Sequence, residues 1–151
     1  MDRPGILESI ALRRKSRAAM ELCLWADVTE SEGIVGDHRG GTKRQVTILS
    51  RERWSQTIAE LNVDLPWHTR RANLLVSGVD LAKAIGNQIR IGECIFDIHG
   101  EVDPCDRMDE YHDGLMQALY PDTRGGVWGR VVRGGCLKLN QAVSIHDTAK
   151  Q

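Results

Sequence analysis

Alternating apolar and polar positions predict that most of this chain folds into short β-strands. Glycine and polar turn residues interrupt the alternation at short intervals, which is typical of strands joined by tight turns. In residues 20–28, Leu22, Leu24 and Ala26 would share one face of a strand, although residues 20–24 fit a helical turn equally well. Strands are expected at residues 5–13, 20–28, 44–49, 73–77, 88–93, 94–98, 127–133 and 137–145.

Apolar residues at helical spacing predict two or three short helices between these strands. One helix is expected to begin after Ser50, a favourable N-cap, and to end before Pro66. A helical turn is expected at 80–85 and a longer helix at about 107–119. The apolar faces of the two longer helices consist of Trp54, Ile58 and Leu61 in the first and Met108, Tyr111, Leu115 and Leu119 in the second.

The order of these elements predicts a mostly β fold, a closed or partly closed β barrel with two or three short inserted helices. Residues 127–133 and 137–145 are expected to form a closing hairpin around Gly134 and Gly135. The length of 151 residues suits one domain, and no internal repeat or linker interrupts it. We therefore expect a single domain over residues 1–151.

Charge and composition narrow the classes of function. The 20 basic and 21 acidic residues give a net charge of −1, so nucleic-acid binding is not expected and any anion site must be a local cluster. Residues 13–17 form the longest basic run, which fits either a solvated turn or a phosphate-binding site. The first ten residues include acidic side chains and no long apolar run, so a secretory signal is not expected, and no apolar stretch is long enough for a membrane helix. A cytoplasmic protein without membrane contact is expected.

Cys105 is the strongest candidate for chemistry among the cysteines. It follows Pro104 in a predicted turn before a helix, where the backbone can hold the thiol outward and the helix dipole favours the thiolate. A thiolate binds thiophilic metals and can carry sulfane sulfur. The flanking Asp103 and Asp106 oppose its ionisation. The residues alone leave a second interpretation open, in which Cys105 is a small buried apolar side chain.

The other three cysteines are weaker candidates. No two cysteines are close enough for zinc-knuckle or CxxC spacing. Cys23 and Cys94 lie in apolar strand patterns and are expected in the core, whereas Cys136 is expected as an incidental thiol at a hairpin tip.

Basic residues beside glycines form a second group of candidates. Glycines let backbone amides approach an anion, and Arg side chains bind phosphate through two parallel hydrogen bonds. Taken singly, each of these arginines is more typical of a solvated surface charge. The group consists of His38, Arg39, Lys43 and Arg44 in the Gly-rich segment, Arg70, Arg71 and Asn73 before a strand, and Arg124 and Arg130 around a Gly-Gly pair.

Several short motifs, taken in order, resemble the MOSC family, named for the C-terminal domain of molybdenum cofactor sulfurases. The similarity covers roughly residues 33–143, and the order of the motifs is more specific than any one of them. Ala72 departs from the family, which usually has an acidic residue there, and Asn140–Gln141 replaces a Gly-Asp turn. The motifs are Gly33–His38, Arg44–Leu49, Arg71–Leu74, Ile91–Glu93, Pro104–Cys105, Arg124–Val127 and Arg130–Val131.

The resemblance implies a MOSC-type β barrel of the small stand-alone bacterial kind. It implies that Cys105 ligates the metal of the molybdenum cofactor, molybdopterin, or handles sulfur with no cofactor bound. The residues that it suggests as cofactor contacts are Arg44, Arg71, Asn73 and Arg124, to which the basic cluster adds His38 and Arg130.

Four functions remain open. Relatives include reductases of N-hydroxylated compounds, so the first is a molybdenum-dependent reductase with a small N-hydroxylated substrate and an external electron donor. The second is a sulfur carrier or sulfurtransferase, in which Cys105 bears a persulfide and the partner is a sulfur donor or acceptor protein. The third is a non-enzymatic module that binds or delivers the cofactor. The fourth is a partner-binding domain in which Cys105 is vestigial.

Overall fold

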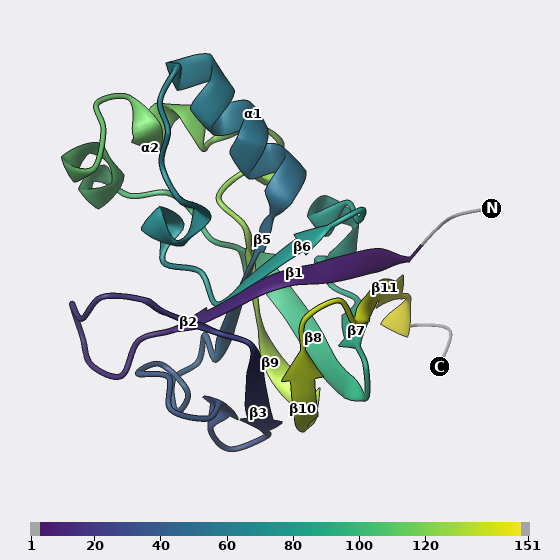
Figure 1. The fold of residues 1–151 in the computed structure, drawn as a ribbon. Helices are drawn as coiled ribbons and strands as arrows, with labels where there is room; N and C mark the ends of the chain where they lie inside the picture. The colour runs from purple at the N-terminus through teal and green to yellow at the C-terminus, as the bar shows by residue number, and fades with distance from the viewer. Residues whose placement is uncertain (1–3, 149–151) are drawn as a thin grey trace.

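The computed structural model describes residues 4–148, and within them seven strands close into a barrel (Figure 1). The barrel closes because Gly5 and Ile6 lie opposite Val143 and Ala142. Around the barrel, the strands are β11 (Ala142–His146), β7 (Gln88–Ile91), β8 (Cys94–Glu101), β9 (Val127–Arg133), β5 (Val46–Ser50), β6 (Leu74–Ser77) and β1 (Gly5–Leu12). This closed, mostly β barrel confirms the predicted fold class.

Two strand predictions need correction. The predicted strand at 20–28 is divided at Leu24 into β2 (Glu21–Cys23), which pairs with the end of β1, and β3 (Trp25–Thr29). The three apolar residues that were expected on one face of a strand differ in burial, because Leu22 and Leu24 are 61% and 77% exposed while Ala26 is buried. The prediction of a common face is wrong because β2 lies at the edge of the sheet, where nothing in the described chain covers Leu22 or the following Leu24.

The predicted closing hairpin is also wrong. β10 (Gly135–Lys138) pairs with β3, which in turn pairs with β4 (Gly33–Ile34), while β11 pairs with β7 and β1. Gly134 makes this path possible, because a Cβ atom there would lie 2.2 Å from the Val28 carbonyl oxygen. The Gly-Gly pair therefore lets the chain pass close to β3 and does not form a hairpin turn.

The helices lie on one side of the barrel, over β5 and β6 (Figure 1). α1 (Arg51–Leu61) begins at the predicted N-cap, where the Ser50 hydroxyl accepts a hydrogen bond from the Arg53 amide at 3.2 Å. The remaining short elements are η1 (Trp67–Arg70), η2 (Leu81–Ala84), η3 (Asp106–Glu110), α2 (Leu115–Ala118) and η4 (Pro121–Thr123). Within residues 4–148, no helix has the length and apolarity that crossing a membrane requires.

The single helix predicted at 107–119 is wrong. The chain forms η3 and α2 instead, separated by Gly114 with a φ of 89°, and the Asp109 carboxylate accepts a hydrogen bond from the Met116 amide at the start of α2. Tyr111 consequently leaves the expected apolar face and is 43% exposed. Gly114 supplies the reason, since its left-handed conformation reverses the chain at little cost.

Two apolar clusters hold the fold together, and they meet at β5 and β6. Ile48 and Leu74 point into the barrel, whereas Leu49 and Leu75, one residue later on each strand, belong to the cluster beneath the helices. That second cluster consists of Leu49, Trp54, Ala72, Leu75, Met108, Leu115 and Leu119. The segment that follows Cys105 is therefore anchored to the barrel by packing through Met108.

Candidate functional site

A cavity of about 180 Å³ opens where the ends of several strands meet the helical side of the barrel. Its lining comes from the segment after β1, the loop before β5, the η1–β6 junction, the β8–η3 segment and the loop before β9. Cys105 and Tyr111 lie on its wall. The described arginines that line it are Arg13, Arg39, Arg44, Arg70, Arg71 and Arg107.

Cys105 is exposed at this cavity. Its extended backbone precedes η3, and its carbonyl accepts a hydrogen bond from the Met108 amide at 3.0 Å, while Pro104 beside it is buried. The alternative of a buried apolar cysteine is therefore wrong. The five-residue η3 replaces the expected long helix, so the positive charge near the sulfur comes from arginine side chains and not from a long helix dipole.

Arg13 and Arg71 are less exposed than Arg39, Arg44 and Arg107, and each has guanidinium nitrogens without a partner in the described chain. Arg13 is only 8% exposed, and its guanidinium makes no hydrogen bond or ion pair with any residue from 4 to 148. Burial lowers the pKa of Arg13, and the nearby charges of Arg71 and Arg39 lower it further, against the opposing effect of Asp37. Arg71 donates from Nη2 to the Ala18 carbonyl, but its buried Nε has no partner in the described chain. Burying polar groups without hydrogen-bond partners costs free energy of folding, unless a bound ligand supplies the missing partners.

Local backbone geometry directs two neighbouring arginines into the cavity. η1 ends where Arg71 takes a left-handed φ of 64° and donates its amide to the His68 carbonyl. This sharp turn leads into β6 and leaves both Arg70 and Arg71 on the cavity lining.

Three more predicted residues lie around the Gly-rich loop. Arg44 lines the cavity, and its guanidinium carbon lies 5.4 Å from the centre of the Trp128 ring. Arg130 does not line the cavity; its Nη1 donates to the Thr42 and Lys43 carbonyls at 3.0 and 3.1 Å and thereby holds the loop. His38 is exposed outside the lining, and its backbone amide donates to the Arg13 carbonyl.

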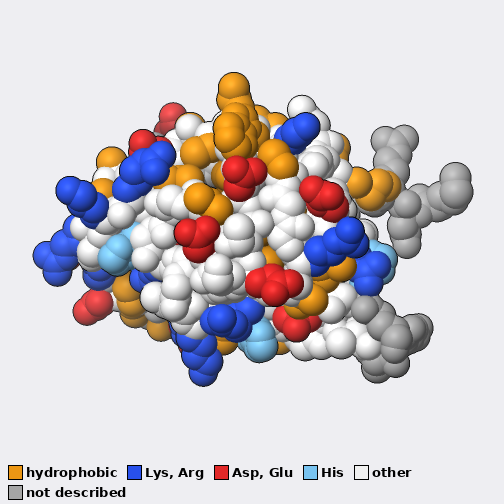
Figure 2. Space-filling view, turned by 90° about the horizontal axis from the view of Figure 1, so that it is seen from below, with side chains coloured by type: hydrophobic (Ala, Val, Ile, Leu, Met, Phe, Trp, Pro, Cys, Tyr) orange, Lys and Arg blue, Asp and Glu red, His pale blue; other side chains and the backbone are white. Residues whose placement is uncertain are grey.

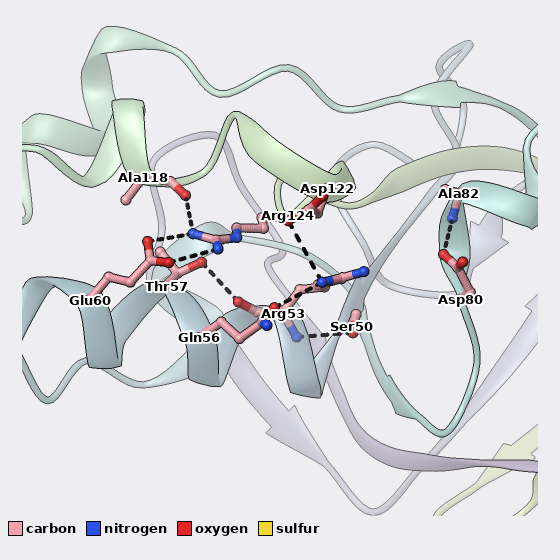
Figure 3. A network of polar contacts seen from close by, with 10 residues as sticks. All are labelled: Ser50, Arg53, Gln56, Thr57, Glu60, Asp80, Ala82, Ala118, Asp122 and Arg124. Carbon is pink, nitrogen blue, oxygen red and sulfur yellow. Dashed lines mark hydrogen bonds and ion pairs between the residues drawn. The ribbon is translucent and has the colours of Figure 1, made fainter.

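Asn73 and Arg124, the other two predicted contacts, hold walls of the site and do not line it. The Asn73 amide is buried and bonds to the Thr47 amide and hydroxyl and to the Ala11 carbonyl, which ties β6 to β5 and β1. Arg124 forms a two-pronged pair with Glu60 at 2.6 and 2.8 Å and also donates to the Ala118 carbonyl (Figure 3). The hydrogen bond from Arg124 lowers the pKa of Glu60, and the same bond raises the pKa of Arg124.

A family model of the MOSC domain matches residues 35–144. The chain belongs to the MOSC domain family. The match leaves out β1, although β1 closes the MOSC barrel and leads directly into Arg13. No curated protein matches the sequence.

Solved structures show the same fold at low sequence identity. The YUAD protein from Bacillus subtilis superimposes with a TM-score of 0.85 at 18% identity, over 96% of this chain and 97% of that one. YiiM from Geobacillus stearothermophilus gives a TM-score of 0.73 at 13% identity, over 95% and 76% of the two chains. YiiM from Escherichia coli gives 0.69 at 15% identity, over 96% and 69%. These likenesses support the MOSC barrel as a fold.

The MOSC motifs contain neither Arg13 nor Arg107, although both line the cavity. Arg13 belongs to the basic run at 13–17, whose Arg14, Lys15 and Arg17 are exposed as a solvated turn would have them, whereas Arg13 itself is buried. Its place at the end of the predicted first strand, residues 5–13, was the available signal. In Figure 2, Lys and Arg side chains gather at the left end, the side on which the β1–β2 connection projects in Figure 1.

The donor groups of the MOSC cavity suit a bound molecule that is anionic and that also accepts a sulfur atom as a ligand. Arg13 and the Arg71 Nε lack partners that an anion such as a phosphate could provide, and the exposed Cys105 thiol faces the same space. Among residues 4–148, no group of three or more His, Cys, Asp or Glu side chains is arranged to hold a metal ion. The donor set present is thus one thiol and several guanidinium groups, which fits a cofactor with a phosphate tail and a thiophilic metal.

Proposed function

We propose that this MOSC domain binds the molybdenum cofactor in the arginine-lined cavity and reduces N-hydroxylated compounds, with Cys105 as the protein ligand of the metal. The observation that carries the proposal is an exposed thiol in the same cavity as the buried Arg13, whose guanidinium has no partner within residues 4–148, and the Arg71 Nε, which has none either. MOSC family membership supports the choice of cofactor.

Each residue has a distinct part in this proposal. Arg13 and Arg71 would hold the phosphate of the pterin, because both line the cavity, Arg13 is 8% exposed and makes no side-chain hydrogen bond within residues 4–148, and the buried Nε of Arg71 has no partner there. Cys105 would supply a thiolate, and the walls would limit access of water to it. When bound, the cofactor supplies the redox centre for cleavage of the N–O bond. An N-hydroxylated amine, two electrons and two protons then give the amine and water, and an external donor protein or reductant provides the electrons.

Metal and pterin content of the purified protein test the proposal. We expect protein from a host that makes the cofactor, grown with molybdate, to retain molybdenum and pterin. Cys105→Ala should lose the metal while keeping its melting temperature, because Cys105 belongs to neither apolar cluster. Cys136→Ala, which removes a partly exposed thiol from β10, is the matched control and should retain the metal. Equal molybdenum in the Cys105→Ala variant and the wild type would overturn the assignment.

Activity then separates a reductase from a cofactor-delivery module. The loaded protein should reduce an N-hydroxylated base with an artificial electron donor such as reduced viologen. Loading without turnover would favour delivery of the cofactor to another protein.

A sulfur carrier is the second candidate, and the exposure of Cys105 favours it independently of any metal. A persulfide on this sulfur would be an anion among the same arginines, and a sulfur donor or acceptor protein would be the partner. Intact-mass spectrometry that finds an added sulfur atom on Cys105, in protein without molybdenum, would favour this function over the reductase.

A further inference from the structure

The arginines that line the cavity outnumber the acidic groups that could neutralise them. Among the described residues of the lining there are six arginines, and Asp103 is the one carboxylate. A phosphate on the pterin would bring roughly two negative charges, so the cavity keeps a surplus of positive charge even when the cofactor is bound. The surplus is large enough for a second anion.

The chain forms its ion pairs with other arginines. None of the six cavity arginines forms an ion pair with a residue from 4 to 148, whereas four arginines outside the lining do so. Two of these pairs are drawn in Figure 3. The four pairs are Arg14–Glu21, Arg51–Glu8, Arg53–Asp122 and Arg124–Glu60.

The cavity arginines differ in how their guanidinium groups are used. Arg70 donates to the Gly125 and Val102 carbonyls at 3.1 and 3.0 Å, so its hydrogen bonds lie within the chain. Arg13 and Arg71 are the less exposed pair that the proposed function assigns to the phosphate. The other three are exposed, and their guanidinium groups make no hydrogen bond or ion pair with any residue from 4 to 148. These rim arginines are Arg39, Arg44 and Arg107.

The fold holds the rim arginines in place without neutralising them. The Arg39 amide donates to the Asp37 carboxylate at 3.2 Å, which fixes the backbone of the Gly-rich loop and leaves the guanidinium free. The guanidinium carbon of Arg44 lies 5.4 Å from the centre of the Trp128 ring, a contact that orients a cation and keeps its charge. Arg107 comes from η3 and lines the same cavity.

We propose that the rim arginines form a second anion subsite, which binds a carboxylate or phosphate group of the substrate and makes the protein prefer acidic N-hydroxylated compounds. The proposal deepens the proposed function and rests on it for the N–OH chemistry. Carboxylate and phosphate share one means of recognition, because a guanidinium binds either through paired N–H donors. The inner arginines would hold the cofactor, and the rim arginines would select the substrate.

Two matched amidoximes test the proposal. 4-Carboxybenzamidoxime is an anion at pH 7, and 4-carbamoylbenzamidoxime is a neutral molecule of nearly the same shape. Isothermal titration calorimetry of the purified protein without an electron donor measures their binding without turnover. We expect the carboxylate to bind about tenfold more tightly at low salt, and we expect high salt to reduce this preference because exposed charges are screened.

Substitutions locate the preference. The double variant Arg39→Gln/Arg44→Gln keeps hydrogen-bond donors and removes two charges from exposed positions, so it should fold and bind the two amidoximes with nearly equal affinity. Arg14→Gln is the matched control, since Arg14 is exposed but lies outside the lining, and it should keep the wild-type preference. Arg13→Gln should also keep the preference, because Arg13 belongs to the inner pair.

Several results would overturn the rim subsite. They are equal affinities or no measurable binding of the two amidoximes in the wild type, a preference that survives in the double variant, and a preference that Arg13→Gln abolishes. Loss of molybdenum and pterin from the double variant would also overturn it, because the rim would then hold the cofactor. Failure of the proposed function has a different signature: neither amidoxime is reduced with reduced viologen, whatever their affinities.

Discussion

The unpaired guanidinium of Arg13 makes opposite contributions to stability and to binding. Burying a charge without a partner costs free energy, and a similar apolar side chain removes that cost. We therefore expect Arg13→Met to raise the free energy of unfolding of the cofactor-free protein by roughly 0.5–2 kcal/mol. The same change should weaken anion binding, so that added inorganic phosphate raises the melting temperature less than in the wild type.

Arg14 provides the control for this substitution. Arg14 is adjacent in sequence, has a side chain that is 65% exposed and pairs with Glu21 at 3.0 Å. Arg14→Met should change neither stability nor the response to phosphate by a large amount. Lower stability of Arg13→Met together with an undiminished phosphate response would contradict the role given to Arg13.

Thiol labelling distinguishes Cys105 from Cys94, which the sequence alone could only rank as a stronger and a weaker candidate for chemistry. Burial raises the pKa of Cys94 to about 11, with further contributions from Glu93 and Cys136, and the side chain is fully buried. At pH 8 this thiol stays protonated and inaccessible, so a maleimide should label the exposed Cys105 of the folded protein and spare Cys94. Cys94 should become reactive only in denaturant. Equal labelling of the two residues in the native state would be incompatible with the packing of the barrel.

Sequence reasoning selected Cys105 as a candidate because a Pro-Cys turn has a local physical meaning, and the structure places this residue exposed at the cavity. It could not separate residues that bind a guest from residues that hold the walls. Asn73 and Arg124 have side chains that could donate to an anion, yet the Asn73 amide donates to the Ala11 carbonyl and accepts from the Thr47 hydroxyl, and Arg124 pairs with Glu60. Which partner a polar side chain finds depends on contacts between distant segments, and these are absent from a local motif.

The pair between Glu60 and Arg124 links α1 to the segment after α2, and it predicts a pH effect. Arg124 lowers the pKa of Glu60 in the folded protein, whereas the unfolded chain has the ordinary value. The folded state therefore binds fewer protons between these two values. The stabilisation is complete above the ordinary pKa and is lost as the pH falls through the lowered one.

Urea unfolding at pH 7 and at pH 3 measures this effect. The wild type should lose more stability than Glu60→Gln over that interval, because the variant has no carboxylate to protonate. Glu110→Gln, which changes an exposed carboxyl group of η3, should behave like the wild type. Identical pH dependence in the wild type and Glu60→Gln would show that the pair contributes nothing to folding.

Elements with a clear period were predicted well, and chain reversals were not. The Ser50 cap and the apolar face of α1 are encoded within a few residues, so α1 was found at its correct start. The helix expected at 107–119 and the hairpin around Gly134 failed for a shared reason. The spacing of apolar residues indicates which side chains are buried. It does not indicate that the chain changes direction at Gly114, or that Gly134 lets the chain pass close to β3.

At the scale of the whole molecule, the number and order of strands predicted a barrel, but its closure depends on pairs of residues far apart in sequence. β1 pairs with β11 through Gly5 and Val143, and neither residue carries a local signal for that contact. The cavity arises from the same long-range arrangement, since Arg13, Arg71 and Cys105 come from three separate segments. Sequence could therefore supply members of the site but not the full set.

The two apolar clusters share β5 and β6, and this predicts how the molecule unfolds. Leu115 is fully buried in the cluster beneath the helices, so Leu115→Ala should lower the free energy of unfolding by roughly 2–5 kcal/mol through lost burial and a residual cavity.

Because Leu49 and Leu75 belong to that cluster while Ile48 and Leu74 belong to the barrel, the two clusters should lose their order together. Tryptophan fluorescence, to which Trp54 on the buried face of α1 contributes, and far-ultraviolet circular dichroism should then give coincident urea transitions in both the wild type and the variant. Ile85→Ala, a change at a partly exposed apolar residue after η2, serves as the control and should shift the midpoint far less. A variant whose fluorescence transition precedes its dichroism transition would mean that the helical side, with Cys105, can unfold while the barrel persists.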